Sequence, residues 1–208
     1  MQVIVLFIMA YLIGSIPTSV WVSRYFFNID IRDFGSGNAG ATNTFRVLGV
    51  KAGSFVFLFD FLKGFVAVDL AYLIMAGEMS NTALTNLQIG LGIVAVLGHI
   101  FPIWANFRGG KGIATLFGMI LAIQPTVALC LVGVFVVMLF TTRYVSLSSI
   151  AASVAFPILL LFIFREPVML YKVFAIAAAV LVVLSHHKNI GRLVSGNENR
   201  VPMFGKGK

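Results

Sequence analysis

The sequence predicts an all-α polytopic membrane helix bundle with seven transmembrane segments, an external N-terminus and a cytoplasmic C-terminus. Three observations predict this fold. Hydrophobic residues make up 60% of the 208 residues, several apolar runs approach the ~20 residues that a membrane-spanning helix needs, and the basic residues gather in a few connections between those runs. Such a composition excludes an ordinary water-soluble domain.

Five apolar runs are interpreted directly as spans. The first begins at the N-terminus with no basic region before it and no short cleavage site after it, so we expect a retained span and not a removed signal peptide. The single cysteine, Cys130, lies in an apolar run without a partner, which excludes a disulfide framework. The five spans are residues 3–22, 55–75, 87–104, 145–164 and 168–185.

Residues 113–140 are harder, because Gln124-Pro125-Thr126 divides them into two pieces that are each shorter than a standard span. The positive-inside rule places the basic connections in the cytoplasm. For Lys111 and Arg143 to share that side, residues 113–140 must either cross the membrane twice or enter it and return to the same side. The chain then has seven membrane segments, which we assign to a single domain, 1–208. The basic connections hold Arg24, Arg32, Arg46, Lys51, Arg108, Lys111, Arg143 and the tail 188–208; the opposite connections are 77–86, with only Glu78, and Arg165-Glu166-Pro167.

A polar stretch, residues 33–46, is rich in glycine and small side chains. Ordering such backbone is costly and buries little area, so we expect a loop that fits closely around a ligand. A helix over its second half would set a hydroxyl and a guanidinium four residues apart near a helix N-terminus. An ordinary cytoplasmic loop is the alternative. The candidate ligand contacts are Ser36, a hydroxyl; Asn38, Thr42 and Asn43, which orient by hydrogen bonds; and Arg46, a bidentate phosphate grip.

A second polar segment, Gly109-Gly110-Lys111-Gly112, is here named the glycine loop. Glycines let backbone N–H groups turn inward at one oxyanion, and lysine adds a mobile charge, so the loop is a candidate phosphate site. The alternative is a plain cytoplasmic turn that obeys the positive-inside rule.

Polar groups also lie at two further cytoplasmic boundaries. On a continuing helix, His186 and Asn189 would face the same way, and the imidazole can bind phosphate, orient a hydroxyl or accept a proton. An interfacial basic cluster is the alternative, which His187 fits better. Near Arg143, Ser149 belongs to a hydroxyl cluster whose common role is to bond helical carbonyls.

Ionisable residues inside the spans are costly unless they face the protein interior. Asp60 and Lys63 are three residues apart and can pair, Asp69 has no obvious partner, and His99 is expected to pack between helices. No cysteine or carboxylate stands at ligand spacing from His99, so neither a metal nor another cofactor is expected. A transporter coupled through Asp60 or Asp69, and a lipid-binding scaffold with net charge +8, are the competing classes.

The four polar patches are rich in phosphate-binding groups and poor in carboxylates. A metal-dependent hydrolase is therefore disfavoured, as is a Walker-type ATPase, because Lys111 is followed by Gly112 and not by Ser or Thr. Nucleic acid is not an expected partner, since the positive-inside rule accounts for the basic residues. The balance favours an enzyme that joins a phosphorylated, water-soluble substrate to something apolar.

Six motifs in order strongly resemble the bacterial acyl-phosphate:glycerol-3-phosphate acyltransferases, the PlsY family, over nearly the whole chain. They are Gly35-Ser36-Gly37-Asn38-Ala39-Gly40-Ala41-Thr42-Asn43 with Arg46 and Gly49, Phe59-Asp60-Phe61-Leu62-Lys63-Gly64, Gly98-His99 with Pro102, the glycine loop with Ala114-Thr115, Arg143-Tyr144-Val145-Ser146-Leu147 with Ser149, and His186 with Asn189-Ile190 and Arg192-Leu193.

The resemblance implies a seven-helix enzyme of the bacterial inner membrane with a cytoplasmic active site. It would transfer a fatty acyl group from acyl-phosphate to the 1-hydroxyl of sn-glycerol-3-phosphate, giving lysophosphatidic acid and phosphate in the first step of phospholipid synthesis. A soluble enzyme that makes acyl-phosphate is an implied partner. The family's functional residues match Ser36, Arg46, the glycine loop, His186 and Asn189, and its structural tail glutamate matches Glu198.

An acyl-phosphate has a good leaving group, so positioning is the main task, which is worth about 7 to 11 kcal/mol. We expect Lys111, the Gly109 and Gly110 amides and Arg46 to hold the two phosphates. His186 and a donor phosphate are both candidates for the base, and a covalent acyl-Ser36 is disfavoured because no histidine–acid pair accompanies it. The groups that orient the glycerol hydroxyls and the acyl carbonyl are Ser36, Asn38, Thr42, Ser149 and Asn189.

Overall fold

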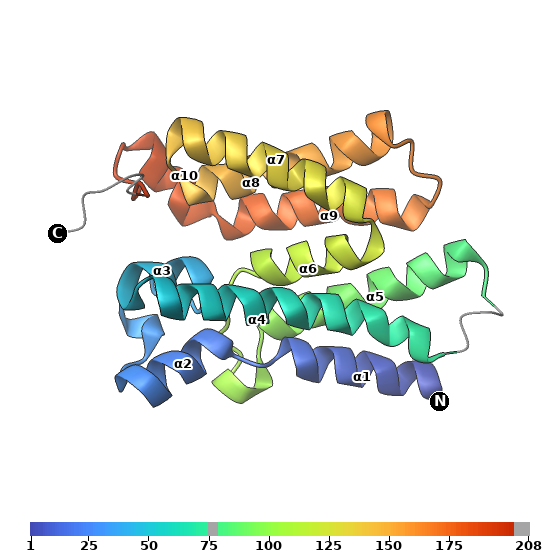
Figure 1. The fold of residues 1–208 in the computed structure, drawn as a ribbon, viewed down its shortest axis with the longest axis horizontal. Helices are drawn as coiled ribbons and strands as arrows, with labels where there is room; N and C mark the ends of the chain where they lie inside the picture. The colour runs from blue at the N-terminus through green and yellow to red at the C-terminus, as the bar shows by residue number, and fades with distance from the viewer. Residues whose placement is uncertain (75–78, 202–208) are drawn as a thin grey trace. The chain divides into compact units, whose positions relative to one another are not determined.

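A computed structural model describes residues 1–74 and 79–201, and all regular structure within these ranges is helical. The predicted all-α class is confirmed. The end of the predicted second span at Met75, the residue Glu78 and the tail beyond Val201 lie outside the described residues. The backbone forms two compact units, Met1–Gln124 and Pro125–Lys208 (Figure 1). That both belong to one catalytic domain stays a prediction.

The first unit begins with a broken helix. The predicted first span is not one continuous helix, because α1 ends at Gly14 and α2 begins at Thr18. Pro17 lacks a backbone N–H and disfavours helical backbone in the residue before it, which explains the break. The unit's α-helices are α1 (Gln2–Gly14), α2 (Thr18–Phe27), α3 (Ala41–Leu48), α4 (Val50–Asp69), α5 (Asn81–Ile100) and α6 (Ile113–Ile123), with single 3₁₀ turns at Ile31–Asp33, Leu70–Leu73 and Ile103–Ala105.

Helix α4 packs against α1, α3, α5 and α6, and α1 packs against α5. Its contact with α6 is a backbone contact, since a Cβ at Gly64 would overlap the carbonyl of Thr115 and one at Gly118 would overlap that of Phe61. Small residues of this kind let helices approach closely where the surrounding solvent is lipid. This packing fixes the end of α5 and the start of α6, between which the glycine loop lies.

The second unit is an antiparallel hairpin series whose adjacent helices pack in chain order. Its buried centre is aromatic, because the ring of Phe156 lies 5.8 Å from that of Tyr171 and 6.1 Å from that of Phe174. The predicted break at Gln124 is confirmed, since α6 ends one residue before it and α7 begins one residue after it. The helices are α7 (Pro125–Thr142), α8 (Val145–Ile158), continued by a π-helical segment Leu159–Ile163, α9 (Met169–Ser185) and α10 (His187–Val194).

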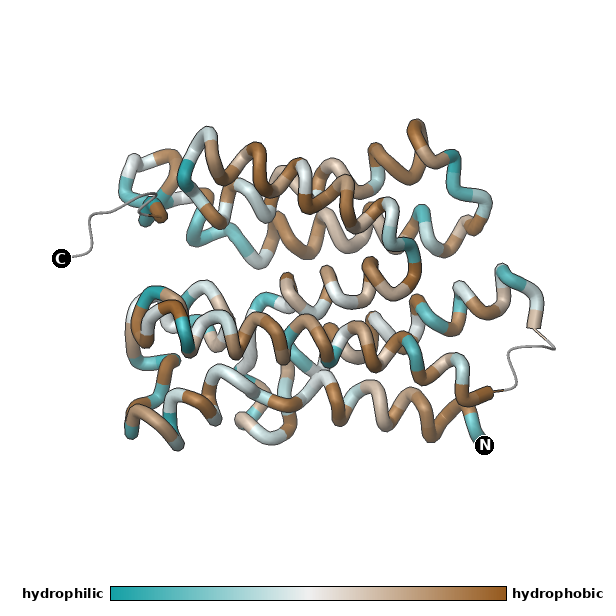
Figure 2. The backbone as a smooth tube through the Cα atoms, viewed as in Figure 1, coloured by the Kyte–Doolittle hydropathy of each residue, from teal (hydrophilic) through white to brown (hydrophobic). Residues whose placement is uncertain are grey.

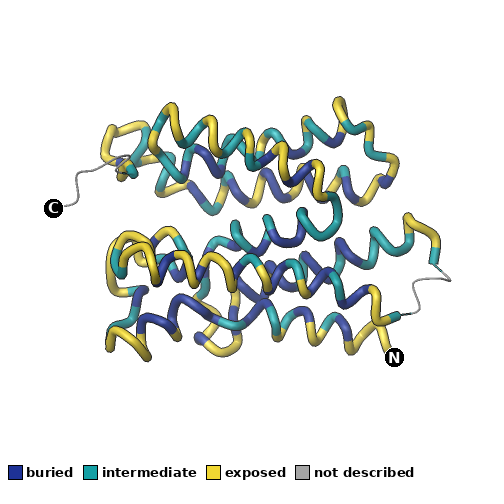
Figure 3. Tube along the Cα trace, viewed as in Figure 1, coloured by how far each residue is buried: buried dark blue, intermediate teal, exposed yellow. Residues whose placement is uncertain are grey.

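Hydrophobic residues predominate along the helices and hydrophilic ones at many of the turns (Figure 2). Buried and exposed positions alternate along most of the long helices (Figure 3), yet many exposed positions are large and apolar, such as Phe162 at 70% and Leu184 at 63% exposed. Outward apolar faces of this extent fit lipid as the surrounding solvent.

Within the described residues, four segments are long and apolar enough to cross a membrane: Gln2–Phe27, Asn81–Ala105, Pro125–Thr142 and Val145–Ile163. A fifth is obtained if α9 and α10, which meet at a 59° bend, count as one span. The two further spans of the seven predicted would be α4, which carries four charged side chains, and α6, with only 11 residues.

Candidate active site

The loop that carries Ser36 (residues 34–40, here the Ser36 loop) is held in shape by Asn43. This side chain is 1% exposed. Its Oδ1 accepts from the Ser36 N–H at 2.8 Å, and its Nδ2 donates to the carbonyls of Ile31 at 3.1 Å and Phe34 at 2.9 Å. The amide that was predicted to orient substrate therefore bonds the backbone of the loop, so Asn43 positions Ser36.

The expected helix over the second half of the polar stretch is confirmed as α3, which begins at Ala41. Thr42 and Arg46 lie one turn apart on it, and both are exposed together with Ser36, while Asn38 is half-buried. These side chains are thus within reach of a water-soluble ligand, as binding groups must be.

The glycine loop is paired with the end of α5. The Gly109 N–H donates to the Ile100 carbonyl and the Gly110 N–H to the His99 carbonyl, each at 3.1 Å. These two amides are therefore occupied within the chain, which corrects the expectation that they bind phosphate. Gly112 adopts φ +76°, a left-handed conformation that favours glycine, and caps the start of α6.

The two predicted loops meet at Gly110. A Cβ at this position would overlap both Nε2 of His99 and the carbonyl oxygen of Ala39, which belongs to the Ser36 loop. Only a residue without a side chain allows this contact, so glycine here serves close packing. The structure thereby joins the Ser36 loop to the loop that carries Lys111, which is half-buried.

A clamp that the sequence analysis did not predict fastens the same region. Arg32 donates to Asp30 through Nε at 3.0 Å and Nη2 at 2.7 Å, and through Nη1 to the carbonyls of Ala105 at 3.0 Å and Arg108 at 3.4 Å. Hydrogen bonds from Arg32 hold the pKa of Asp30 well below its usual range, so the clamp stays charged. The spacing of Asp30 and Arg32, two residues apart, is compatible with an ion pair between them. The bond from Arg32 to the Ala105 carbonyl spans 73 residues and had no local signal in the sequence.

In the second unit, His186 lies at the break between α9 and α10. α9 ends at Ser185, where the predicted last span ended, and the chain bends by 59° before α10, so His186 and Asn189 do not lie on one continuous helix. The imidazole is 4% exposed, with Nδ1 at 2.7 Å from the Val182 carbonyl and 3.2 Å from Ser185 Oγ. When Nδ1 carries the proton and donates to Val182, Nε2 is the acceptor of the neutral ring.

Glu198 gathers the polar groups of the second unit. Its carboxylate, on a residue 8% exposed, accepts from Ser146 Oγ at 2.8 Å, Asn189 Nδ2 at 2.7 Å and Arg192 Nε at 2.6 Å. Ser149 is also buried, one turn further along α8 than Ser146. The Arg143–Ser149 boundary and the His186 end are thus joined through the tail.

Burial raises the pKa of Glu198, but hydrogen bonds from Asn189, Arg192 and Ser146 outweigh it and hold the pKa below its ordinary value of 4.5. The Glu198 carboxylate therefore stabilises the folded protein fully at pH values above 4.5. This stabilisation is lost as the pH falls through the lower pKa that Glu198 has in the folded state. We expect Glu198→Gln to cost about 1–3 kcal/mol at neutral pH. The difference in thermal midpoint from the wild type should shrink below pH 4.5; a difference that stays constant with pH contradicts this.

Contacts join the four polar patches in two pairs, one pair in each unit. The Ser36 loop meets the glycine loop in the first unit, and the Arg143–Ser149 boundary meets the His186 end in the second. That these two pairs form one site stays a prediction. In the part of the chain that the structure describes, no group of three or more His, Cys, Asp or Glu side chains is arranged to hold a metal ion.

Comparison with known proteins gives consistent matches. The family model described as glycerol-3-phosphate acyltransferase matches residues 4–196. Glycerol-3-phosphate acyltransferases of Enterococcus faecalis and Macrococcus caseolyticus are 42% and 43% identical, covering 97% of this chain and 93% and 98% of their own lengths. Crystal structures of PlsY (YgiH), an integral membrane glycerol 3-phosphate acyltransferase, in its glycerol 3-phosphate and lysophosphatidic acid forms, match with TM-scores of 0.84 and 0.80 at 37% and 36% identity, covering 97% of this chain and 96% of each.

Proposed function

The chain belongs to the glycerol-3-phosphate acyltransferase family and is an integral membrane enzyme of the first step of phospholipid synthesis, and we propose that its acyl donor is an acyl-phosphate. The acyl group passes to the 1-hydroxyl of sn-glycerol-3-phosphate. The products are lysophosphatidic acid, which is named in one of the matching structures, and inorganic phosphate.

The observation that carries this proposal is the contact of the two loops at Gly110. It supports a site in which two cations, Arg46 on α3 and Lys111 in the glycine loop, serve two phosphorylated substrates. Lysine and arginine are both common phosphate binders, arginine through its planar fork and lysine as a point charge. A thioester donor would release a thiolate and would place no phosphate at the reacting carbonyl.

The reaction needs little nucleophilic activation. The 1-hydroxyl oxygen of glycerol-3-phosphate attacks the acyl carbonyl carbon, a new ester C–O bond forms, and the bond from that carbon to the phosphate oxygen breaks. Phosphate leaves with the electron pair, and the hydroxyl proton goes either to a donor phosphate or to His186. In the second case Nε2 is the base, because Nδ1 is engaged by Val182.

The remaining residues orient and shape the site. Ser36, Asn38 and Thr42 of the first unit, with Ser149 and Asn189 of the second, orient the glycerol hydroxyls and the acyl carbonyl, while Asn43 holds the Ser36 loop. Donors aimed at that carbonyl stabilise the oxyanion that develops on it. Gly109, Gly110 and Gly112 give the glycine loop its course, so that Lys111 supplies the charge.

The proposed topology has seven spans, an external N-terminus, a cytoplasmic C-terminus and an active site that faces the cytoplasm of a bacterial inner membrane. The basic connections around Arg46, Lys111, Arg143 and the tail support this orientation, because positive residues favour the cytoplasmic side. A soluble enzyme that makes acyl-phosphate is then a natural partner at that face.

The experiment supplies the purified protein with glycerol-3-phosphate and either palmitoyl-phosphate or palmitoyl-CoA. We expect lysophosphatidic acid and inorganic phosphate in equal amounts from the acyl-phosphate, and no product from the thioester. Product from palmitoyl-CoA alone contradicts the proposed donor. A burst of product with a trapped acyl-enzyme would instead indicate a covalent acyl-Ser36 intermediate.

A further inference from the structure

Three charged or ionisable side chains form a buried cluster in the first unit, outside both loops. Lys63 Nζ on α4 lies 2.8 Å from Asp60 Oδ1, and Nδ1 of His99, near the end of α5, lies 3.6 Å from the same oxygen. Asp60 is only 2% exposed, and Lys63 and His99 are each 6% exposed. The predicted Asp60–Lys63 pair is thus confirmed, and His99 joins it.

Stability alone does not explain such a cluster. Moving two charges out of water costs several kcal/mol per ion, and well-packed apolar residues of similar volume are often as stabilising or more so. Charged groups inside membrane segments are accordingly rare and tend to serve a function. The cluster therefore calls for a role in what it contacts.

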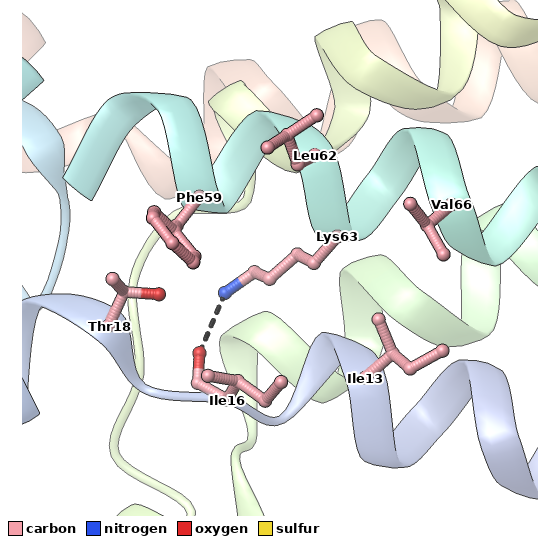
Figure 4. Close-up of a pocket in the computed structure, with 7 residues that line it drawn as sticks. All are labelled: Ile13, Ile16, Thr18, Phe59, Leu62, Lys63 and Val66. Carbon is pink, nitrogen blue, oxygen red and sulfur yellow. Dashed lines mark hydrogen bonds between the residues drawn. The ribbon is translucent and has the colours of Figure 1, made fainter. Parts of the chain in front are cut away.

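One end of the cluster holds the break in the first helix. Lys63 Nζ donates to the carbonyl of Ile16 at 3.0 Å, and this carbonyl lies between α1 and α2 (Figure 4). The apolar side chains of Ile13, Leu62 and Val66 line the same pocket as Lys63. Lys63 thus ties the α1–α2 break to α4.

The other end of the cluster contacts the glycine loop. The backbone carbonyl of His99 accepts a hydrogen bond from the Gly110 N–H at 3.1 Å. The side-chain Nε2 of His99 lies so close to Gly110 that a Cβ there would overlap it. The same Cβ would also overlap the carbonyl oxygen of Ala39, in the Ser36 loop. The imidazole, which lies 3.6 Å from Asp60, therefore packs directly against Gly110, one residue before Lys111.

We propose that Asp60, Lys63 and His99 are positioning residues that set the location of Lys111 relative to the Ser36 loop. The contacts run without interruption from Ile16 through Lys63, Asp60 and His99 to Gly110. The inference rests on the proposed function, since it gives the cluster a purpose only if Lys111 holds a phosphate. A rigid supporting layer of this kind is what keeps binding groups in productive geometry.

The test measures thermal midpoint, KM, kcat and calorimetric affinity for glycerol-3-phosphate in the full-length protein. His99→Leu removes the ring that lies 3.6 Å from Asp60. The double variant Asp60→Asn/Lys63→Gln removes both charges together, so that no uncompensated buried charge hinders folding. Lys63→Arg keeps both charges, but its longer planar head cannot occupy the same place. Asp69→Asn, at the end of the same helix and outside the cluster, is the matched control.

We expect KM and the dissociation constant for glycerol-3-phosphate to rise about tenfold or more in His99→Leu and in the double variant, since small misplacements cost up to ~100-fold. Lys63→Arg should show a smaller rise in the same direction, and Asp69→Asn none. If the cluster only stabilised the fold, the variants would show a lower thermal midpoint and a lower yield of active enzyme, but an unchanged KM. That result in every variant that folds would overturn the inference. The calorimetric affinity for glycerol-3-phosphate is measured without any acyl donor. If the wild-type protein binds glycerol-3-phosphate but does not use acyl-phosphate, the proposed donor is refuted, while the effect of the cluster on binding can still be tested.

Discussion

Gly110→Ala is expected to abolish glycerol-3-phosphate acylation almost completely. The added Cβ would overlap both the Ala39 carbonyl oxygen, which is backbone, and the ring of His99, which is buried and has little room to move. The Ser36 loop and the glycine loop must then separate. Overpacking of this kind costs about 1–3 kcal/mol of stability, whereas a shift of ~1 Å between binding groups costs about 100-fold in rate.

Gly133→Ala is the matched control for this substitution. Gly133 lies within α7, and a Cβ there would have no neighbour within 4 Å. It should keep wild-type activity and gain about 0.5–1 kcal/mol, because alanine is the better helix former. Initial rates and thermal midpoints of both variants are the measurement. A Gly110→Ala protein with the wild-type rate would mean that the two loops do not need to touch.

Lys111→Ala is expected to lower kcat/KM for glycerol-3-phosphate acylation by about 10- to 100-fold, because a hydrogen bond to a charged group contributes about 1.5–3 kcal/mol. The loss should fall mainly on KM for a phosphorylated substrate, since the cation is proposed to bind and not to transfer a proton. Steady-state kinetics with each substrate varied in turn give this division.

Lys51→Ala removes an exposed cation from the first turn of α4 and serves as its control. It should leave the kinetics unchanged, although it alters the net charge of the protein by the same amount. Unchanged kinetics in Lys111→Ala would refute the role of the glycine loop as a phosphate site.

Much of the fold followed from local signals in the sequence. The proline after Gln124 marked the end of α6, the spacing of Asp60 and Lys63 indicated a pair on one helix face, and the helix after Gly40 began where expected. These features depend on residues within one or two helical turns of each other, where propensity and periodicity act. They are therefore readable without the tertiary structure.

Other features depended on segments far apart in the chain. The Gly110 contact with Ala39, and the bond from Arg32 to the Ala105 carbonyl, exist only once α5 has returned the chain to the Ser36 loop. The inward amide of Asn43 was predicted to face substrate, because its type and position looked the same as those of its exposed neighbours. The hydrogen bonds between the backbone of the glycine loop and the end of α5 likewise could not be predicted from the amino-acid composition of the loop.

The local break at Pro17 was nevertheless missed. Pro17 stood inside the predicted first span as a visible signal, and the run 3–22 was still taken as one helix because its hydropathy is continuous. The bend at His186 had no proline or glycine to mark it. It coincides with the bond from Nδ1 of His186 to the Val182 carbonyl and brings Asn189 to Glu198 across the following turn.

A structure of this protein determined with glycerol-3-phosphate bound decides whether the two loops form the phosphate site. We expect the phosphate oxygens within hydrogen-bond distance of Lys111 Nζ, of the Arg46 guanidinium, or of both, with the Ser36 loop and the glycine loop still in contact at Gly110. A phosphate held by neither residue, for example by Arg143 or Arg192 of the second unit alone, would contradict it.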